Sequence, residues 1–121
     1  MAHNYKNLKV WQNAMEIAVD VYQLTLLYPK DEQYGISSQL KRCAISIPSN
    51  IAEGSGRSTD KEFARFLSIA LGSSYELECQ LLLSNKLNLA KELNLTTVLE
   101  KVSEVQKMIY KLRNNLINNS K

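Results

Sequence analysis

The sequence predicts an all-α fold, an antiparallel up-down-up-down bundle of four helices, and three observations support this prediction. Apolar residues recur at spacings of three and four in four separate segments, which is typical of amphipathic helices. Hydrophobic residues make up 45% of the chain, against two prolines and four glycines. The connections between the segments are short, so consecutive helices should lie side by side. We expect the 121 residues to form one domain, residues 1–121.

The first helix is predicted over residues 8–27, before Pro29, and it has two apolar stripes. One stripe contains Val10, Ala14, Ile17, Val21 and Leu24, and the other contains Trp11, Met15, Ala18 and Tyr22. Together they cover more of the helix than one core contact needs. Two interpretations stay open, namely a central helix of a monomeric bundle and a helix that also packs on a neighbouring subunit. The candidate residues for such an interface are Val10, Ala14, Ile17 and Val21.

The second helix is predicted over residues 37–54, with Ser37 as its N-cap and Gly54 at its end. Its expected inner face contains Ile36, Leu40, Cys43 or Ala44, Ile47 and Ile51. Pro48 lies inside this pattern and removes one backbone donor. Short polar side chains around it, such as that of Asn50, are expected to bind the backbone groups that the proline frees.

The third and fourth helices are predicted over residues 60–89 and 97–117, and a capping box of the form Thr-x-x-Glu precedes each. The boxes begin at Thr59 and Thr97. Gly72 is expected at a close helix crossing, because a glycine lets another backbone approach. The fourth helix keeps a heptad spacing through Val98, Val102, Val105, Ile109, Leu112 and Leu116. Residues 1–6 and 118–121 are expected to be flexible.

Composition excludes several classes of function. The single histidine, His3, leaves no Glu-x-x-His pair for a metal and no base for a serine or cysteine nucleophile unless it folds back. We therefore expect no metal site, no cofactor and no enzymatic activity. Cys43 and Cys79 lie in apolar helical patterns, which favours buried free thiols over a disulfide and indicates a reducing, cytoplasmic setting. No segment is apolar enough to cross a membrane, so no membrane partner is expected.

Two carboxylates, Glu53 and Glu76, lie close to the predicted inner faces. Acid–base catalysis and structural ion pairing are both open for them, and ion pairing is favoured because a carboxylate near a core needs a partner to stay charged. The candidate partners are Arg42, Arg57 and Arg65.

Basic residues gather at the end of the chain, where five face one acidic residue from position 101 onward, against a total formal charge of +3. The candidate nucleic-acid-binding residues are Lys101, Lys107, Lys111 and Arg113. A solvated helix face is the alternative interpretation. No aromatic stacking platform is evident in the sequence, so any recognition should be of backbone and shape.

An ordered set of residues resembles the family of 23S rRNA intervening-sequence proteins over nearly the whole length. It includes residues 8–11, 32–35 and 39–42, the stretch 46–54, Arg57, and the pairs 66–67, 72–73, 76–77 and 80–81. Its structural signature contains Pro48, Asn50, Glu53, Gly54, Arg57, Gly72 and Glu76. The resemblance implies a bacterial four-helix bundle with no established enzymatic activity.

The chain is also similar to the accessory protein of diversity-generating retroelements. This resemblance implies a symmetric homo-oligomer, with a pentamer favoured, that binds RNA or DNA and a reverse transcriptase or another protein. The charge of +3 departs from the strongly basic character of that accessory protein. Two hypotheses follow: a homo-oligomeric nucleic-acid-binding protein, and a protein-interaction or structural oligomer that binds no nucleic acid.

Overall fold

The computed structural model describes residues 4–119, which form four α-helices and two short 3₁₀ turns and contain no strand. The helices are α1 (Lys9–Thr25), α2 (Ile36–Ser55), α3 (Asp60–Lys86) and α4 (Glu92–Asn119). The 3₁₀ turns are η1 (Tyr5–Asn7) and η2 (Lys30–Glu32). The prediction of an all-α fold with four helices is confirmed.

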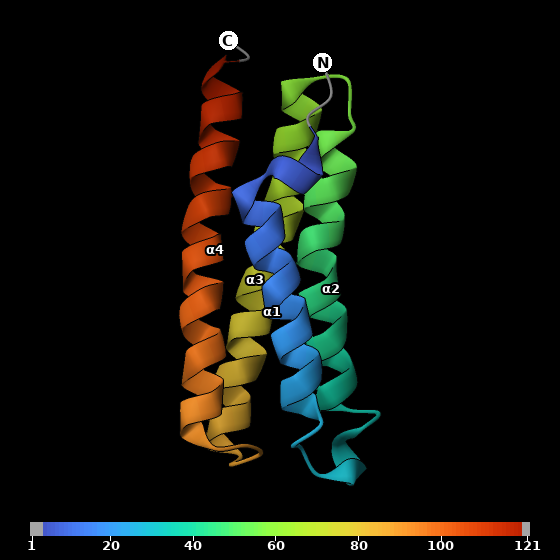
Figure 1. Cartoon of the computed structure of the whole chain (residues 1–121), viewed down its shortest axis with the longest axis vertical. Helices are drawn as coiled ribbons and strands as arrows, with labels where there is room; N and C mark the ends of the chain where they lie inside the picture. The colour runs from blue at the N-terminus through green and yellow to red at the C-terminus, as the bar shows by residue number, and fades with distance from the viewer. Residues whose placement is uncertain (1–3, 120–121) are drawn as a thin grey trace.

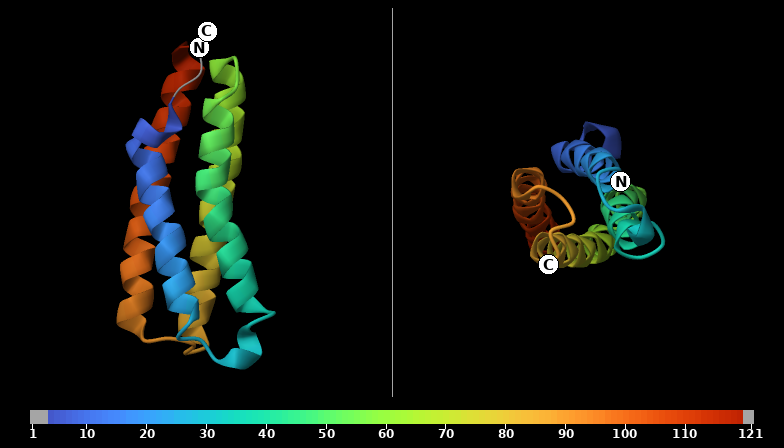
Figure 2. Two further views of the ribbon diagram at one scale, coloured as in Figure 1. Left: turned by 45° about the vertical axis from the view of Figure 1, so that its right-hand side comes forward. Right: turned by 90° about the horizontal axis from the view of Figure 1, so that it is seen from below.

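The four helices lie side by side around one core. Following the colour along the chain in Figure 1, α1 descends, α2 rises, α3 descends and α4 rises again. The end-on view in Figure 2 shows the helices arranged in chain order around a centre. The α2–α3 and α3–α4 pairs pack most extensively, and α1 and α4 make the least extensive contact of the four neighbouring pairs. The first and last helices therefore meet along the most weakly packed seam.

The core consists of the apolar stripes that the helical periodicity indicates. On α1 the predicted inner stripe is buried. On α3 the apolar pattern predicts the inner positions Phe63, Leu67, Ala70, Ser74, Leu77 and Leu81, and these are buried as well. The largest fully buried side chains are Phe63, Ile17, Leu40, Ile47, Ile51, Leu67, Leu77, Leu81, Leu95, Ile109, Val21 and Val102. Each such aliphatic or aromatic side chain contributes about 1.5–3 kcal/mol of transfer free energy. The sequence pattern thus identified the inward faces correctly.

The helix α2 continues without a break through Pro48, which is buried. The carbonyl left without an N–H donor is that of Ala44, four residues earlier. The Asn50 amide instead donates to the carbonyl and hydroxyl oxygens of Ser46, at 2.8 and 3.0 Å, and Ser46 Oγ lies 2.8 Å from Ser73 Oγ on α3. The polar side chains therefore tie α2 to α3, and the expectation that Asn50 compensates the proline's lost bond is wrong.

The close backbone approach lies at Gly54 and not at Gly72. A Cβ atom at Gly54 would lie 2.6 Å from the Cβ of Phe66 and 3.0 Å from Cδ1 of Phe63. At Gly72 a Cβ would meet no atom within 4 Å, because this residue is on the exposed side of α3. The prediction of a tight crossing at Gly72 is therefore wrong.

Of the three predicted N-terminal caps, one is confirmed and two are wrong. Thr59 does cap α3, accepting a hydrogen bond from the Glu62 N–H at 3.1 Å. Ser37, however, lies inside α2 and is buried, because α2 begins at Ile36 after Gly35. Thr97 is also inside a helix, donating its hydroxyl to the Leu93 carbonyl at 2.9 Å, because α4 begins at Glu92.

The end of α3 explains why α4 begins early. Asn88 has a φ of 56°, and its N–H donates to the Asn85 carbonyl, while the Leu89 N–H donates to the Ser84 carbonyl. These two bonds are those of a Schellman motif, which ends a helix abruptly. The chain therefore leaves α3 at Lys86 and enters α4 at Glu92.

The predicted flexible ends are partly ordered. Residues 5–7 form η1, and the Tyr5 ring packs edge-on against Trp11 with a centroid distance of 5.1 Å. Residues 118 and 119 belong to α4. Residues 1–3, including His3, and residues 120–121 lie outside the described range, so the expectation for them is not tested.

Candidate nucleic-acid interface

The four basic residues proposed from the sequence lie in three different surroundings on α4. Lys101 points to α1, where its Nζ lies 2.6 Å from Oδ2 of Asp20. This hydrogen bond raises the pKa of the Lys101 ammonium, with a smaller opposing effect of burial. Lys101 is thus engaged in the α1–α4 contact and does not share a free basic surface with the other three residues.

Arg113 lies on the opposite side of α4, next to α3. Its Nη1 is 3.4 Å from the Ser68 hydroxyl, and its Cζ lies 5.1 Å from the centre of the Tyr110 ring. The guanidinium therefore makes a cation–π contact with Tyr110. This contact places a permanent positive charge beside an aromatic ring that is about half exposed.

Lys107 and Lys111 are the two residues that the structure does bring together, one turn apart and both exposed. The helical spacing of four, three and four residues places Glu100 and Glu104 on the same outward face. This face is acidic in the first half of α4 and basic in the second. Because Glu104 is only three residues from Lys107, it offsets part of the positive charge there.

A hollow of about 260 Å³ lies beside Lys107, where α3 meets α4. Its lining consists of Tyr75 from α3 and Ser103, Gln106, Lys107 and Tyr110 from α4. The two tyrosines are 52% and 53% exposed. Gln106 Nε2 lies 3.4 Å from the Ser74 carbonyl and 3.5 Å from Oε1 of Glu78.

This pair of exposed aromatic rings corrects the sequence analysis, which found no aromatic platform. Tyr75 and Tyr110 are 35 positions apart and come together only because α3 and α4 pack along their lengths. The local signal that could have found them is that each occupies a non-core position of an amphipathic helix. A tyrosine there is exposed on one side and free to contact a ligand.

Comparison with known proteins decides the family. The family model described as "23S rRNA-intervening sequence protein" matches residues 6–111. The chain belongs to this family. Among solved structures, the chain is similar to a protein of unknown function from the S23 ribosomal protein family of Bacteroides thetaiotaomicron, with a TM-score of 0.78. Sequence identity is 22%, and the match covers 86% of this chain and 97% of the other, a likeness that shows the fold. No curated protein matches.

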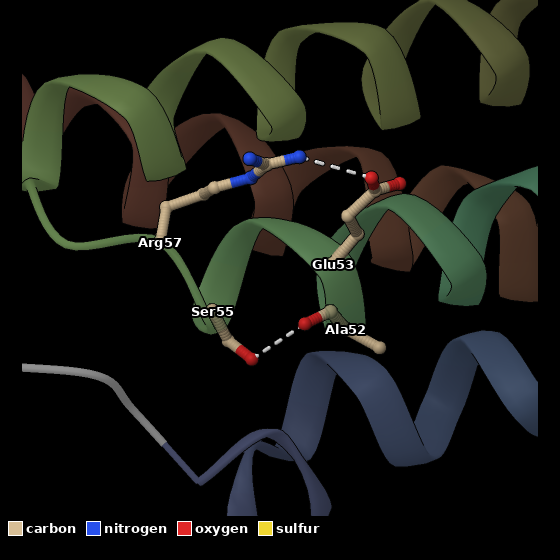
Figure 3. Close-up of polar contacts among 4 residues, drawn as sticks. All are labelled: Ala52, Glu53, Ser55 and Arg57. Atoms are coloured by element: carbon tan, nitrogen blue, oxygen red, sulfur yellow. Dashed lines mark hydrogen bonds and ion pairs between the residues drawn. The ribbon is translucent and has the colours of Figure 1, made fainter.

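The signature stretch at the end of α2 is built for packing. Glu53 Oε1 accepts a hydrogen bond from Arg57 Nη2 at 3.0 Å, and Ser55 Oγ donates to the Ala52 carbonyl at 2.8 Å (Figure 3). The Arg57 guanidinium also lies 4.6 Å from the centre of the Phe66 ring. These contacts lie at the α2–α3 connection beside Gly54. The expected pairing of Glu53 with Arg57 is confirmed, but Glu53 is 56% exposed, so the expectation that it lies close to an inner face is wrong.

The second signature carboxylate, Glu76, has a different partner from the expected arginine. Its Oε1 accepts a hydrogen bond from Cys43 Sγ at 2.6 Å, and Gln80 Oε1 lies 3.8 Å from the same sulfur. Burial, together with this bond to Glu76, raises the pKa of the Cys43 thiol to about 12. Cys43 is buried as expected, but Cys79 is exposed, so the expectation for the second thiol is wrong.

The candidate interface residues of the first helix are also corrected. Val10, Ala14, Ile17 and Val21 are at most 5% exposed and belong to the core of this chain. The second stripe of α1 is the accessible one. It lines an apolar groove of about 370 Å³ between α1 and α2, bounded by Tyr5, Trp11, Met15, Ala18, Ile45, Pro48, Ser49 and Ala52.

The described residues were also expected to contain no metal site and no membrane-spanning helix. Within residues 4–119, no cluster of three or more histidine, cysteine or acidic side chains could hold a metal ion. Over the same range, no helix has the length and apolar character that crossing a membrane requires.

Proposed function

We propose that this family member binds nucleic acid, without catalysing a reaction, through phosphate contacts from Lys107 and Lys111. The observation that carries the proposal is the second half of α4. From Val105 to Asn119 this helix contains three basic residues and no acidic one, and two of the three are exposed on its outward face. Lysine ammonium groups in such a position neutralise phosphates and release their counterions.

The proposal includes no covalent chemistry, because the thiol at the centre of the polar cluster is unsuited to it. The nucleophile in cysteine catalysis is the thiolate, and a raised pKa keeps Cys43 protonated at neutral pH. The neutral Cys43 thiol donates a hydrogen bond to the Glu76 carboxylate. This arrangement favours a structural role for both residues.

The test is fluorescence anisotropy of labelled RNA and DNA from low to physiological salt. We expect saturable binding whose log K falls with log salt at a slope of about −0.9 for each phosphate contacted on a duplex. The double variant Lys107→Glu/Lys111→Glu should lose binding. The control Lys30→Glu/Lys86→Glu makes the same charge change at exposed positions elsewhere and should bind like the parent. Equal losses in both variants, or no binding at low salt, would overturn the proposal.

Association of several copies, with a pentamer favoured, is a second candidate function that one observation supports. The groove between α1 and α2 is lined mainly by apolar side chains, and Met15 and Ile45 in its lining are 41% and 43% exposed. Packing of this surface against a second copy would remove apolar area from water at about 25 cal/mol per Å². Symmetric copies would also bring their basic helix faces into one field.

Light scattering coupled to size exclusion tests the association. Ile45→Asp should reduce the mass toward that of one chain while the helical circular dichroism is retained. Ile69→Asp places the same charge at a position on α3 with similar exposure, 47% against 43%, and should leave the mass unchanged. A monomeric parent protein would contradict this candidate function.

A further inference from the structure

We propose that the hollow between Tyr75 and Tyr110 receives an unpaired base of a single-stranded nucleic acid. The inference rests on the proposed nucleic-acid binding and narrows it to a class of ligand. Two tyrosine rings from different helices line one hollow, and each ring is about half exposed. A base stacks on such a ring regardless of its identity, since every base has a π face.

The polar lining of the hollow suits a base as well. Ser103 offers a hydroxyl and Gln106 an amide, both able to hydrogen-bond to the edge of a stacked ring. The Gln106 contacts to Ser74 and Glu78 are long, at 3.4 and 3.5 Å, so they compete weakly with a ligand. Lys107 on the same rim is placed to bind the phosphate of the nucleotide whose base is stacked.

The hollow is small and open to solvent. At about 260 Å³ it is below the range of roughly 300–1,000 Å³ typical of pockets for drug-sized ligands. One ring fits such a volume better than a folded cofactor does. The aromatic walls and the basic rim together match a nucleobase with its phosphate.

A path for the rest of the strand leads from the hollow along the α3–α4 contact. Ser68, Gly72 and Tyr75 follow one another at spacings of four and three and so share one face of α3. Gly72 leaves open space between the other two, since a Cβ there would meet no atom within 4 Å. Arg113 lies at the Ser68 end of this path, beside the Tyr110 ring. The path therefore has one basic side chain near each end, Lys107 and Arg113, although Glu104 offsets part of the charge of Lys107.

A duplex would not use this site. The faces of paired bases are covered by their neighbours in the stack, so the tyrosines could contact a duplex base only after it left the helix, at a cost of a few kcal/mol. Single strands have no such cost. We therefore expect the aromatic hollow to bind single strands in preference to duplexes. Lys107 and Lys111 should bind the phosphates of both.

The experiment compares labelled oligodeoxythymidine with an abasic strand of the same length, which has the same phosphates and no bases. We expect the base-containing strand to bind about tenfold more tightly. Tyr75→Leu/Tyr110→Leu should abolish this preference without changing affinity for the abasic strand. Tyr75→Phe/Tyr110→Phe keeps both rings and should restore it. Tyr34→Leu removes a tyrosine that is 90% exposed elsewhere and should have no effect.

The outcomes distinguish the two proposals. Equal affinity for both strands, with binding still lost in Lys107→Glu/Lys111→Glu, would overturn the stacking site and leave phosphate binding intact. No binding of either strand would overturn the proposed function itself. Oligouridine compared with oligodeoxyuridine then reports whether the site prefers RNA or DNA, since these two strands differ only in the 2′-hydroxyl.

Discussion

The contact between α2 and α3 is so close that a methyl group at Gly54 would lie 2.6 Å from the Cβ of Phe66, whereas two hollows of about 240 and 160 Å³ lie beside the contact between α1 and α4. The first contact is made by side chains and backbone in direct packing. The second depends on polar links, chiefly Lys101 to Asp20 at 2.6 Å and the Asn13 amide to the Met108 sulfur at 3.3 Å. Most of the signature residues lie at the close contact, so the family pattern describes packing.

The largest expected effect of a single methyl group is at the close contact. Gly54→Ala should lower the free energy of unfolding by about 2 kcal/mol, since the overpacking exceeds the gain in helix propensity. Urea denaturation followed by circular dichroism measures it. A loss below about 0.5 kcal/mol would mean that α2 and α3 can separate slightly at little cost, contrary to the close packing described above.

The buried thiol at the same contact should make stability depend on alkaline pH. Because the pKa of Cys43 is raised from 9.0 to about 12 in the folded chain, only the unfolded chain can ionise this thiol between those values. The contribution of the neutral thiol to the free energy of unfolding is therefore complete well below pH 9. It decreases as the pH rises toward 12, at up to about 1.4 kcal/mol per pH unit. At pH 10 we expect a loss of about 1.4 kcal/mol relative to neutral pH, measured by urea denaturation.

Two variants separate this thiol from the other groups that titrate above pH 9. Cys43→Ala should remove this component of the pH dependence, whereas Cys79→Ala, at an exposed position, should keep it. Identical pH profiles for the parent and Cys43→Ala would contradict the raised pKa that burial, together with Glu76, gives the Cys43 thiol.

Substitution of Gly72, which lies on the open surface of α3, should change the free energy of unfolding in the opposite direction to substitution of Gly54. Gly72→Ala should raise the free energy of unfolding by about 0.5–1 kcal/mol, because alanine is the better helix former and the new methyl group meets nothing within 4 Å. The same urea titration measures it. Destabilisation would show that the path beside Tyr75 is narrower than described.

The smallest effect is expected at the α1–α4 seam. The Lys101 and Asp20 side chains are 43% and 27% exposed, so their pair should contribute about 0.5 kcal/mol at low salt and less at high salt. A double-mutant cycle with Lys101→Met and Asp20→Asn isolates the interaction. A coupling energy as large as the Gly54→Ala effect would remove the contrast between the two contacts.

Sequence reasoning succeeded where structure depends on neighbours along one helix. The inward positions of α4, from Val98 to Ile109, followed from heptad spacing alone, and Thr59 was recognised as a cap. Sequence reasoning failed where two segments carry the same helix-start pattern and only one of them begins a helix. The Thr97 capping box resembles the one at Thr59, but the Schellman motif at Asn88 had already ended α3, which let α4 begin five residues earlier.

The candidate site was harder to predict because it depends on contacts between helices. Lys101, Lys107 and Arg113 look alike in the sequence, yet α1 and α3 engage the first and the last on opposite sides of α4. Gly72 was misassigned because small residues suggest a close contact, and only the packing shows which side of α3 faces outward. Tyr75 and Tyr110 become neighbours through the α3–α4 contact, which periodicity within one helix does not reveal.

The ends of the described chain lie at the same end of the bundle, as the left view in Figure 2 shows, and the helices that carry them form the most weakly packed seam. This geometry has a mechanical consequence. A force applied between the two ends pulls α1 away from α4 from one end, so their contacts break in succession and not all at once. The molecule should therefore yield to tension by peeling, at low force, while the hairpin of α2 and α3 bears load last.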